Sequence, residues 1–177
     1  MMSKPQVSIM MGSDSDLEVM SEAAKMLDEF KIPYEILILS THRAPEETAK
    51  YAKGARARGL KVLIAGAGGA AALPGSLASQ TTLPVIGIPI ETKSLGGVDS
   101  LYSIVSMPLG VPVATVGINS AKNAGLLAAQ IIGVTDRKIH QRLVDYKLNL
   151  EKEVLAKNTK LQKLGAAKYL QEKQQAK

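Results

Sequence analysis

Short apolar runs alternate along most of the chain with longer stretches in which apolar residues recur at helical spacing. The runs predict five strands, at Val7–Met11, Tyr34–Leu39, Val62–Ala65, Pro84–Pro89 and Val111–Val116. After the first run, apolar residues lie three or four positions apart, as on one face of an α-helix. These residues are Leu17, Met20, Ala24, Leu27 and Phe30. The strands do not alternate between apolar and polar residues, which is typical of a parallel sheet covered by helices on both faces. The pattern predicts an α/β fold, a three-layer sandwich with a flavodoxin-like or Rossmann-like parallel sheet.

The last part of the chain is helical in pattern. Residues 46–58 and 123–133 each predict a helix, and from Asp136 to about Tyr169 the pattern becomes amphipathic and charged. The apolar residues on one face of this last stretch are Leu143, Tyr146, Leu150, Val154 and Leu161. A helix of that length has no room inside one compact domain of about 150 residues. We therefore expect the long C-terminal helix to pack on another subunit.

The length of 177 residues indicates one domain. We expect a single flavodoxin-like catalytic domain over residues 1–157, which includes the C-terminal helix. A basic tail rich in Lys and Gln follows over residues 158–177, partly helical or disordered, with its last eight residues loose.

Composition narrows the classes of function. The formal net charge is +6, but residues 151–177 carry seven basic and three acidic side chains, so most of the excess lies in the tail. Aromatic residues make up 3% of the chain, too few for base stacking, and we expect no nucleic-acid partner. The absence of cysteine excludes a disulfide framework and a thiolate metal site. Apolar runs are too short for a membrane span, and no leader pattern precedes the first strand, so we expect a soluble cytoplasmic protein without a membrane partner.

Polar or glycine-rich loops follow three successive strands, at the edge where ligands bind in such sheets. Residues 12–16 place Ser13, Ser15 and two carboxylates, Asp14 and Asp16, before a helix. One interpretation is a capping loop, because Ser and Asp accept hydrogen bonds from free helix N–H groups. The other is a cradle for a sugar and a phosphate. The two carboxylates could also hold a magnesium ion, although such short pairs are frequent by chance.

The run from Gly66 to Gly75 is not a Walker A loop, because no Gly-Lys-Ser or Gly-Lys-Thr closes it. No acidic residue ends the second strand, so a dinucleotide site is not expected either. The small residues favour a backbone surface on which a flat ligand could lie with amides exposed. A tight turn with close helix packing is the alternative.

His42 is one of only two histidines in the chain, and it ends a core strand beside Arg43. A lone histidine is often structural, but a strand end in this fold is the ligand rim. His140 lies in the charged helix, where we expect a solvated surface residue. The chain holds no usual metal-ligand set and no nucleophile elbow, so we expect no metal or other cofactor. The remaining hypothesis is a mechanism centred on one histidine.

Four blocks in this order resemble one family, the PurE family of 5-(carboxyamino)imidazole ribonucleotide mutases in purine biosynthesis. The blocks are residues 11–16, residues 40–45, residues 65–71 with Leu73-Pro74-Gly75, and residues 97–105. The resemblance runs from about residue 6 to residue 150. It implies a flavodoxin-like homo-octamer with active sites at subunit interfaces. It also implies an isomerase of IMP biosynthesis that uses no metal or organic cofactor and moves a carboxylate from the exocyclic nitrogen of the ribonucleotide to ring carbon 4.

The resemblance also implies roles for particular residues. His42 would be the proton carrier, Ser13 and Asp16 would contact the ribonucleotide, and Arg43 would hold its phosphate. Further residues in the matching blocks that would bind the substrate are Ser15, Ser40, Gly68, Gly69 and Leu73. Small side chains from Gly66 to Ala72 would suit a closed pocket that retains carbon dioxide.

The chain departs from the family at a few positions. Ala72 stands where the family usually has His before Leu-Pro-Gly, Leu17 where Trp is usual, and Thr41 where Ala is common. The departure at Ala72 leaves open an alternative function, direct carboxylation of aminoimidazole ribonucleotide by carbon dioxide. A second alternative is a nucleotide-binding module without catalysis, against which the presence of His42 and Arg43 argues.

Overall fold

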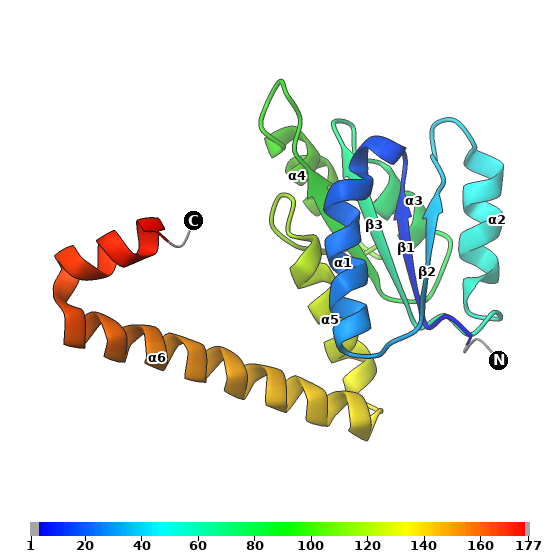
Figure 1. Ribbon diagram of the computed structural model, residues 1–177. Coiled ribbons are helices and arrows are strands. Elements are labelled where there is room, and N and C mark those ends of the chain that lie inside the picture. The colour runs from blue at the N-terminus through cyan, green and yellow to red at the C-terminus, as the bar shows by residue number, and fades with distance from the viewer. Residues whose placement is uncertain (1–3, 176–177) are drawn as a thin grey trace.

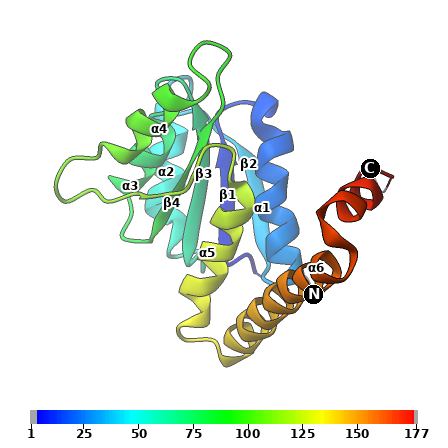
Figure 2. The ribbon, with the colours of Figure 1, turned by 90° about the vertical axis from the view of Figure 1, so that its left-hand side faces the viewer.

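A five-stranded parallel sheet forms the centre of the molecule, with helices on both faces (Figures 1 and 2). The computed structural model describes residues 4–175. The strands are β1 (Val7–Met11), β2 (Tyr34–Ile38), β3 (Val62–Gly68), β4 (Val85–Ile90) and β5 (Ala114–Thr115), in the order β2-β1-β3-β4-β5. The helices are η1 (Asp14–Asp16), α1 (Leu17–Glu29), α2 (Pro45–Ala55), α3 (Leu73–Ala78), α4 (Val98–Val105), α5 (Ala121–Gly133) and α6 (Arg137–Gln175). This architecture confirms the predicted three-layer α/β fold with a long C-terminal helix.

Side chains of each central strand point alternately to the two faces of the sheet, and each face has its own core. Val7, Ile9 and Met11 of β1 pack in a cluster with residues of α1 and α5. Met10 belongs to a second cluster, which includes residues of α2 and α3. Figure 2 shows α1 and α5 on one side of the sheet and α2, α3 and α4 on the other. Because both faces of the sheet are covered, the central strands β3 and β4 are apolar along their whole length, as the sequence pattern indicated.

The fifth strand and the helix after β2 are both shorter than the sequence predicted. The expected strand Val111–Val116 is reduced to Ala114–Thr115, which pair with Ile86 and Gly87 of β4. Pro112 has no N–H to donate, and β5 lies at the edge of the sheet, so little of the ladder can form. Helix α2 begins at Pro45, whose fixed φ suits the first helical position, and ends at Ala55 rather than at about residue 58.

Helix α6 begins on the core and then leaves it (Figure 1). The Asp136 carboxylate caps its first turn, accepting hydrogen bonds from the N–H groups of Ile139 (3.1 Å) and Lys138 (2.9 Å), and these bonds lower the pKa of Asp136. Near this end Ile139 is buried and the Tyr146 ring meets Phe30 edge-on, with centroids 5.5 Å apart. Further along, the predicted apolar face is exposed, at Leu150, Val154 and Leu161.

Helical geometry continues across the expected boundary between residues 157 and 158 and is interrupted only at Gly165, where φ is 72°. Of the last eight residues, which we expected to be loose, residues 170–175 are helical, and the other two lie outside the described residues. The division into a catalytic domain and a tail stays a prediction.

Candidate active site

The loops that follow β1, β2, β3 and β4 meet around one cavity of about 510 Å³. Its lining residues come from all four strand ends: Gly12, Ser13, Ser15, Asp16, Ser40, Thr41, His42, Arg43, Ala67, Gly68, Ala70, Ala72, Leu73, Ile90, Glu91 and Thr92. Parallel strands end at the same edge of a sheet, which is why residues far apart in sequence converge there. The cavity contains hydroxyl, carboxylate, imidazole and guanidinium groups.

The β1–α1 loop combines the two interpretations that the sequence left open. Ser13 is the N-cap of η1, and its Oγ accepts a hydrogen bond from the Ser15 N–H at 3.3 Å. Asp16 stands at the N-cap of α1 but makes no capping hydrogen bond with its side chain. Its Oδ1 accepts a hydrogen bond from the Ser15 hydroxyl at 3.0 Å. Ser13 is therefore a cap, whereas the Asp16 carboxylate is not used to cap the helix and borders the cavity.

The β2–α2 loop carries the imidazole and the guanidinium. Its chain turns sharply, because the Ala44 N–H donates to the Ser40 carbonyl at 2.8 Å before α2 begins. The Arg43 guanidinium donates to the Gly12 carbonyl and so ties this loop to the β1–α1 loop. His42 is exposed and borders both this cavity and a neighbouring one of about 590 Å³. The imidazole is therefore accessible to a ligand from two sides.

The glycine-rich loop after β3 contributes Gly68 and Leu73 to the wall, whereas Gly69 is not among the lining residues. Gly69 has a left-handed φ of 65°, and both of its backbone polar groups are occupied within the protein. Its N–H donates to Ser100 Oγ at 2.9 Å, and its carbonyl accepts from Ser103 Oγ at 3.1 Å. The amide of Gly69 is therefore not exposed to a ligand as we expected of this loop, and a role for Gly69 in substrate binding stays a prediction.

The other predicted site residues line the cavity together. Sequence reasoning missed the end of β4, where Ile90, Glu91 and Thr92 complete the wall. The Thr92 hydroxyl donates to Asp99 at 2.9 Å, which connects this strand end to α4. The available signal was positional, because Glu91 and Thr92 follow a strand, as His42 and Arg43 do, although His42 and Arg43 follow the edge strand β2 and not a core strand as we expected.

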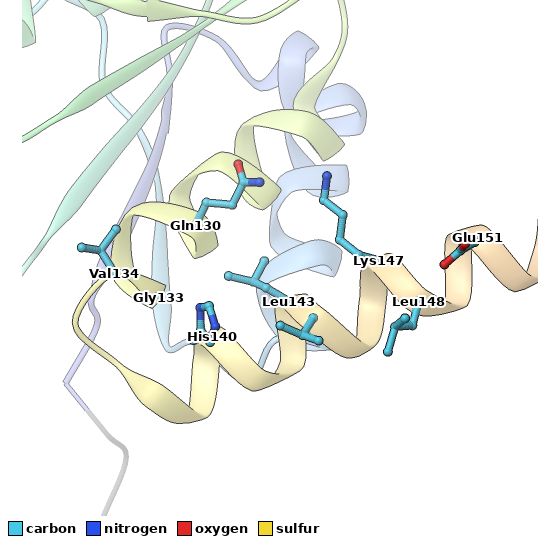
Figure 3. A pocket seen from close by; sticks show the side chains of 9 residues that line it. Gln130, Gly133, Val134, His140, Leu143, Lys147, Leu148 and Glu151 are labelled. Carbon is cyan, nitrogen blue, oxygen red and sulfur yellow. The ribbon is translucent and has the colours of Figure 1, made fainter.

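A separate cavity of about 630 Å³ lies between α5 and α6 (Figure 3). Its wall includes Leu143, Lys147 and His140, and His140 is exposed, as we expected. None of its lining residues belongs to the strand-end loops. Within residues 4–175, no group of three or more His, Cys, Asp or Glu side chains is arranged to hold a metal ion. No helix in the same part of the chain combines the length and the apolar character needed to cross a membrane.

The geometry suits a phosphorylated sugar whose reacting part lies near an imidazole. A guanidinium pairs well with phosphate, and the Asp16 carboxylate can accept hydrogen bonds from sugar hydroxyls. An imidazole at the wall can donate and accept protons near neutral pH.

Comparisons with known proteins point in the same direction. The family described as AIR carboxylase matches residues 6–153. The N5-carboxyaminoimidazole ribonucleotide mutase of Thermotoga maritima is 56% identical, over 96% of this chain and 99% of that protein. The protein of the same name from Pyrococcus horikoshii is also 56% identical, over 96% of each chain.

The phosphoribosylaminoimidazole carboxylase of Candida glabrata is 52% identical over 96% of this chain, which spans 30% of that longer protein. Among solved structures, the crystal structure of Treponema denticola PurE superposes with a TM-score of 0.81 at 33% identity. That superposition covers 89% of this chain and 98% of the other.

Proposed function

The chain belongs to the AIR carboxylase family, the PurE family of the sequence resemblance, and from this we propose that it is an N5-carboxyaminoimidazole ribonucleotide mutase with His42 as its proton carrier. The enzyme is an isomerase of purine biosynthesis, and its substrate is a ribonucleotide. Relatives of the same name at 56% identity over nearly the full length support this activity.

The reaction can be written with one imidazole as both acid and base. Protonated His42 gives its proton to the carbamate nitrogen while the bond from that nitrogen to the carboxyl carbon breaks, releasing carbon dioxide. Ring carbon 4 then attacks the carbon dioxide and forms the new carbon–carbon bond. Neutral His42 finally removes the proton from ring carbon 4, which restores the aromatic ring and the imidazolium. Atoms and protons balance without another reactant.

The observation that carries this proposal is the position of His42 in the same cavity as Arg43, Ser13 and Asp16. We assign the substrate phosphate to Arg43 and the ribose to the Ser13 and Asp16 side chains. Ser15, Ser40, Gly68 and Leu73 line the cavity beside them, and backbone and hydroxyl groups there can complete the contacts. The lining residues after β3 include Ala67, Gly68, Ala70 and Ala72, whose small size leaves room for carbon dioxide in the cavity that His42 borders.

The family resemblance also implies an octamer, and exposed apolar residues support the idea that this chain associates with copies of itself. Val98, Tyr102 and Val105 lie on one face of α4 and are 45%, 66% and 53% exposed. Leu109, in the loop that follows, is fully exposed. Apolar surface of this kind is typical of a subunit interface.

The assembly is tested by sedimentation, which should give a mass of about eight chains. A monomer would contradict the octamer. A cytoplasmic location belongs to the same proposal and is tested by cell fractionation.

The activity is tested with purified protein and the carbamate substrate at low bicarbonate. The 4-carboxylate should form without added bicarbonate. Product that appears only when bicarbonate is raised would overturn the mutase and support direct carboxylation of aminoimidazole ribonucleotide. Ribonucleotide binding without turnover in either condition would identify a non-catalytic module.

A further inference from the structure

His42 lies where two cavities meet, and this raises the question of what holds its ring in place. Both cavities are lined by His42, Ala70 and Ala72. Among residues 4–175, the imidazole makes no hydrogen bond, and its side chain is exposed. A proton carrier must be held within hydrogen-bond reach of the reacting atom. Here that restraint has to come from the backbone on either side of the ring.

Each neighbour of His42 in the chain is tied to a different element. Arg43 donates to the Gly12 carbonyl on the β1 side. On the other side, Thr41 Oγ1 and Ser76 Oγ are 2.7 Å apart, in a half-buried hydrogen bond between residues 35 positions apart. This second bond joins the β2–α2 loop to α3. The loop that carries His42 is therefore held at both ends.

The environment of Ala72 explains why the bond to α3 matters in this chain. Ser76 lies one helical turn after Ala72, since its N–H donates to the Ala72 carbonyl at 2.9 Å. Ala72 itself presents only a methyl group to the two cavities that flank His42. On this side of the ring, the hydrogen bond between the Thr41 and Ser76 hydroxyls joins the loop to α3.

We propose that Thr41 and Ser76 are positioning residues, whose mutual hydrogen bond holds the His42 loop against α3 and so fixes the place of the imidazole in the cavity. This inference rests on the proposed role of His42 as proton carrier. The pair does not touch the reacting atoms; it acts through the backbone of the residue that does.

The fold should survive loss of this bond. Helices α2 and α3 are anchored separately in the core, through Ala52 and Ala55 in α2 and through Leu73 and Leu77 in α3. Thr41→Val keeps the shape of the side chain and removes its hydroxyl. Ser76→Ala removes the other partner. Changes in turnover in these variants therefore report on the loop rather than on unfolding.

Kinetics provide the first test. Each single variant should lower kcat about tenfold with KM within about twofold, because misplacing a catalytic group affects the chemical step more than binding. The double variant should be no worse than either single variant, because both remove the same bond. Thr41→Ser keeps the hydroxyl and should restore kcat. The matched control is Ser79→Ala, whose hydroxyl donates to the Ser76 carbonyl and not to the His42 loop, and which should match the wild type.

The chain's two histidines allow a second test that does not depend on turnover. With histidine labelled at the ring carbon Cε1, relaxation of the His42 signal should show greater ring mobility in Thr41→Val, whereas the His140 signal should not change. The proposal that Thr41 and Ser76 position His42 would be overturned if kcat and the His42 relaxation were both unchanged in the single variants. It would also be overturned if the losses in kcat added in the double variant. A wild-type protein without turnover would overturn the mutase instead, while the relaxation measurement would still decide whether the pair holds the ring.

Discussion

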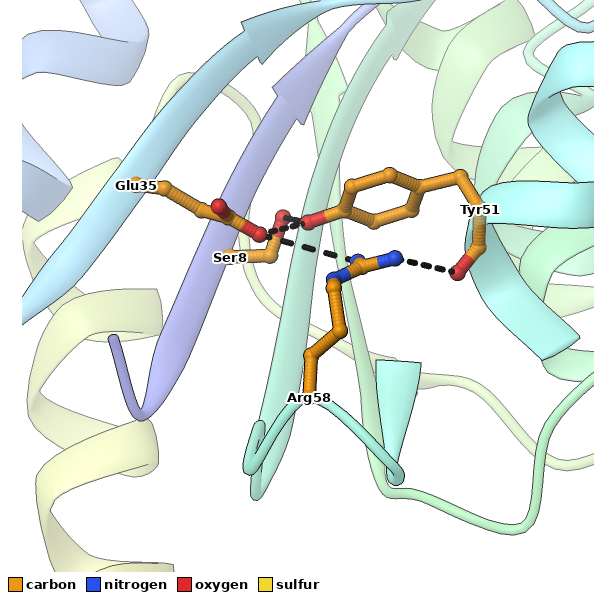
Figure 4. Close-up of polar contacts among 4 residues, drawn as sticks. All are labelled: Ser8, Glu35, Tyr51 and Arg58. Carbon is orange, nitrogen blue, oxygen red and sulfur yellow. Dashed lines mark hydrogen bonds and ion pairs between the residues drawn. The ribbon is translucent and has the colours of Figure 1, made fainter. Parts of the chain in front are cut away.

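Two groups of polar side chains lie at opposite ends of the same strands, and they differ in how their hydrogen bonds are used. Near the amino ends of β1 and β2, Ser8, Glu35, Tyr51 and Arg58 bond to one another (Figure 4). At the carboxyl ends, the His42 ring, the Asp16 carboxylate and the Arg43 guanidinium border a cavity. The polar side chains at the amino ends use their hydrogen bonds within the protein. Those at the carboxyl ends keep hydrogen-bonding capacity for a ligand.

The amino-end group has a structural explanation. Ser8 is fully buried on the α2 face of β1, where its hydroxyl needs a partner. The Tyr51 hydroxyl supplies one at 2.6 Å and also bonds to the Glu35 carboxylate. The Arg58 guanidinium stacks 4.1 Å from the centre of the Tyr51 ring and lies 3.7 Å from Glu35. The group fastens α2 to the edge of the sheet. Polar residue types alone therefore do not separate the two roles, whereas hydrogen-bonding capacity that remains free beside a cavity does.

The largest expected effect is at His42. His42→Asn should lower kcat by about 10²- to 10⁴-fold, the usual contribution of a general acid and base. Ribonucleotide affinity and the melting temperature should stay close to wild type, because the side chain is exposed and borders cavities. Turnover and binding are measured on the same preparation. Full turnover in this variant would remove His42 from its role.

The next effect is at Arg43. Arg43→Ala should weaken ribonucleotide binding about 10- to 100-fold, since hydrogen bonds to charged groups contribute about 1.5–3 kcal/mol. Titration calorimetry with the ribonucleotide and with its nucleoside separates the phosphate contribution, because the nucleoside should bind both proteins equally. Arg56→Ala, at the exposed arginine that follows the last residue of α2, is the matched control. Equal phosphate dependence in wild type and Arg43→Ala would disprove the assignment.

At Tyr51 we expect a loss of stability without a loss of activity. Tyr51→Phe should lower the free energy of unfolding by about 1–3 kcal/mol, because it leaves the Ser8 hydroxyl buried without its partner. The kinetic constants should not change. Tyr34→Phe, which removes an exposed hydroxyl that donates to Asp28, is the control and should be nearly neutral. Loss of turnover in Tyr51→Phe without loss of stability would break the distinction between the two groups.

The smallest effect that we expect is the contribution of Tyr51 to the pH dependence of stability. Burial, followed by the hydrogen bond to Glu35, raises the pKa of Tyr51. A raised pKa means that the folded state favours the neutral phenol, so this stabilisation is complete below the ordinary tyrosine pKa of about 10 and is lost as the pH rises above it. Urea unfolding at about pH 9 and about pH 11 should show a larger loss of stability in wild type than in Tyr51→Phe. Equal losses would contradict the raised pKa.

Most of the fold followed from short-range pattern. The non-alternating apolar runs predicted the parallel sheet, because both of its faces are covered by helices. Where tertiary context decides, the prediction was less accurate. The length of β5 depends on its place at the sheet edge, and residues 170–175 are helical although their composition suggested otherwise.

Most of the side chains that line the site could be named from the sequence, because each of them follows a strand and parallel strands end at the same edge of a sheet. His42, Arg43, Ser13 and Asp16 could be named for that reason. Which of these polar groups keep hydrogen-bonding capacity for a ligand depends on contacts between elements far apart in the chain. Gly69 uses its amide on Ser100, Ser13 caps a turn, and Thr41 bonds Ser76 across 35 residues. Such pairings depend on how α3 and α4 pack against the sheet, and strand and helix periodicity carries no information about which hydroxyl meets which amide.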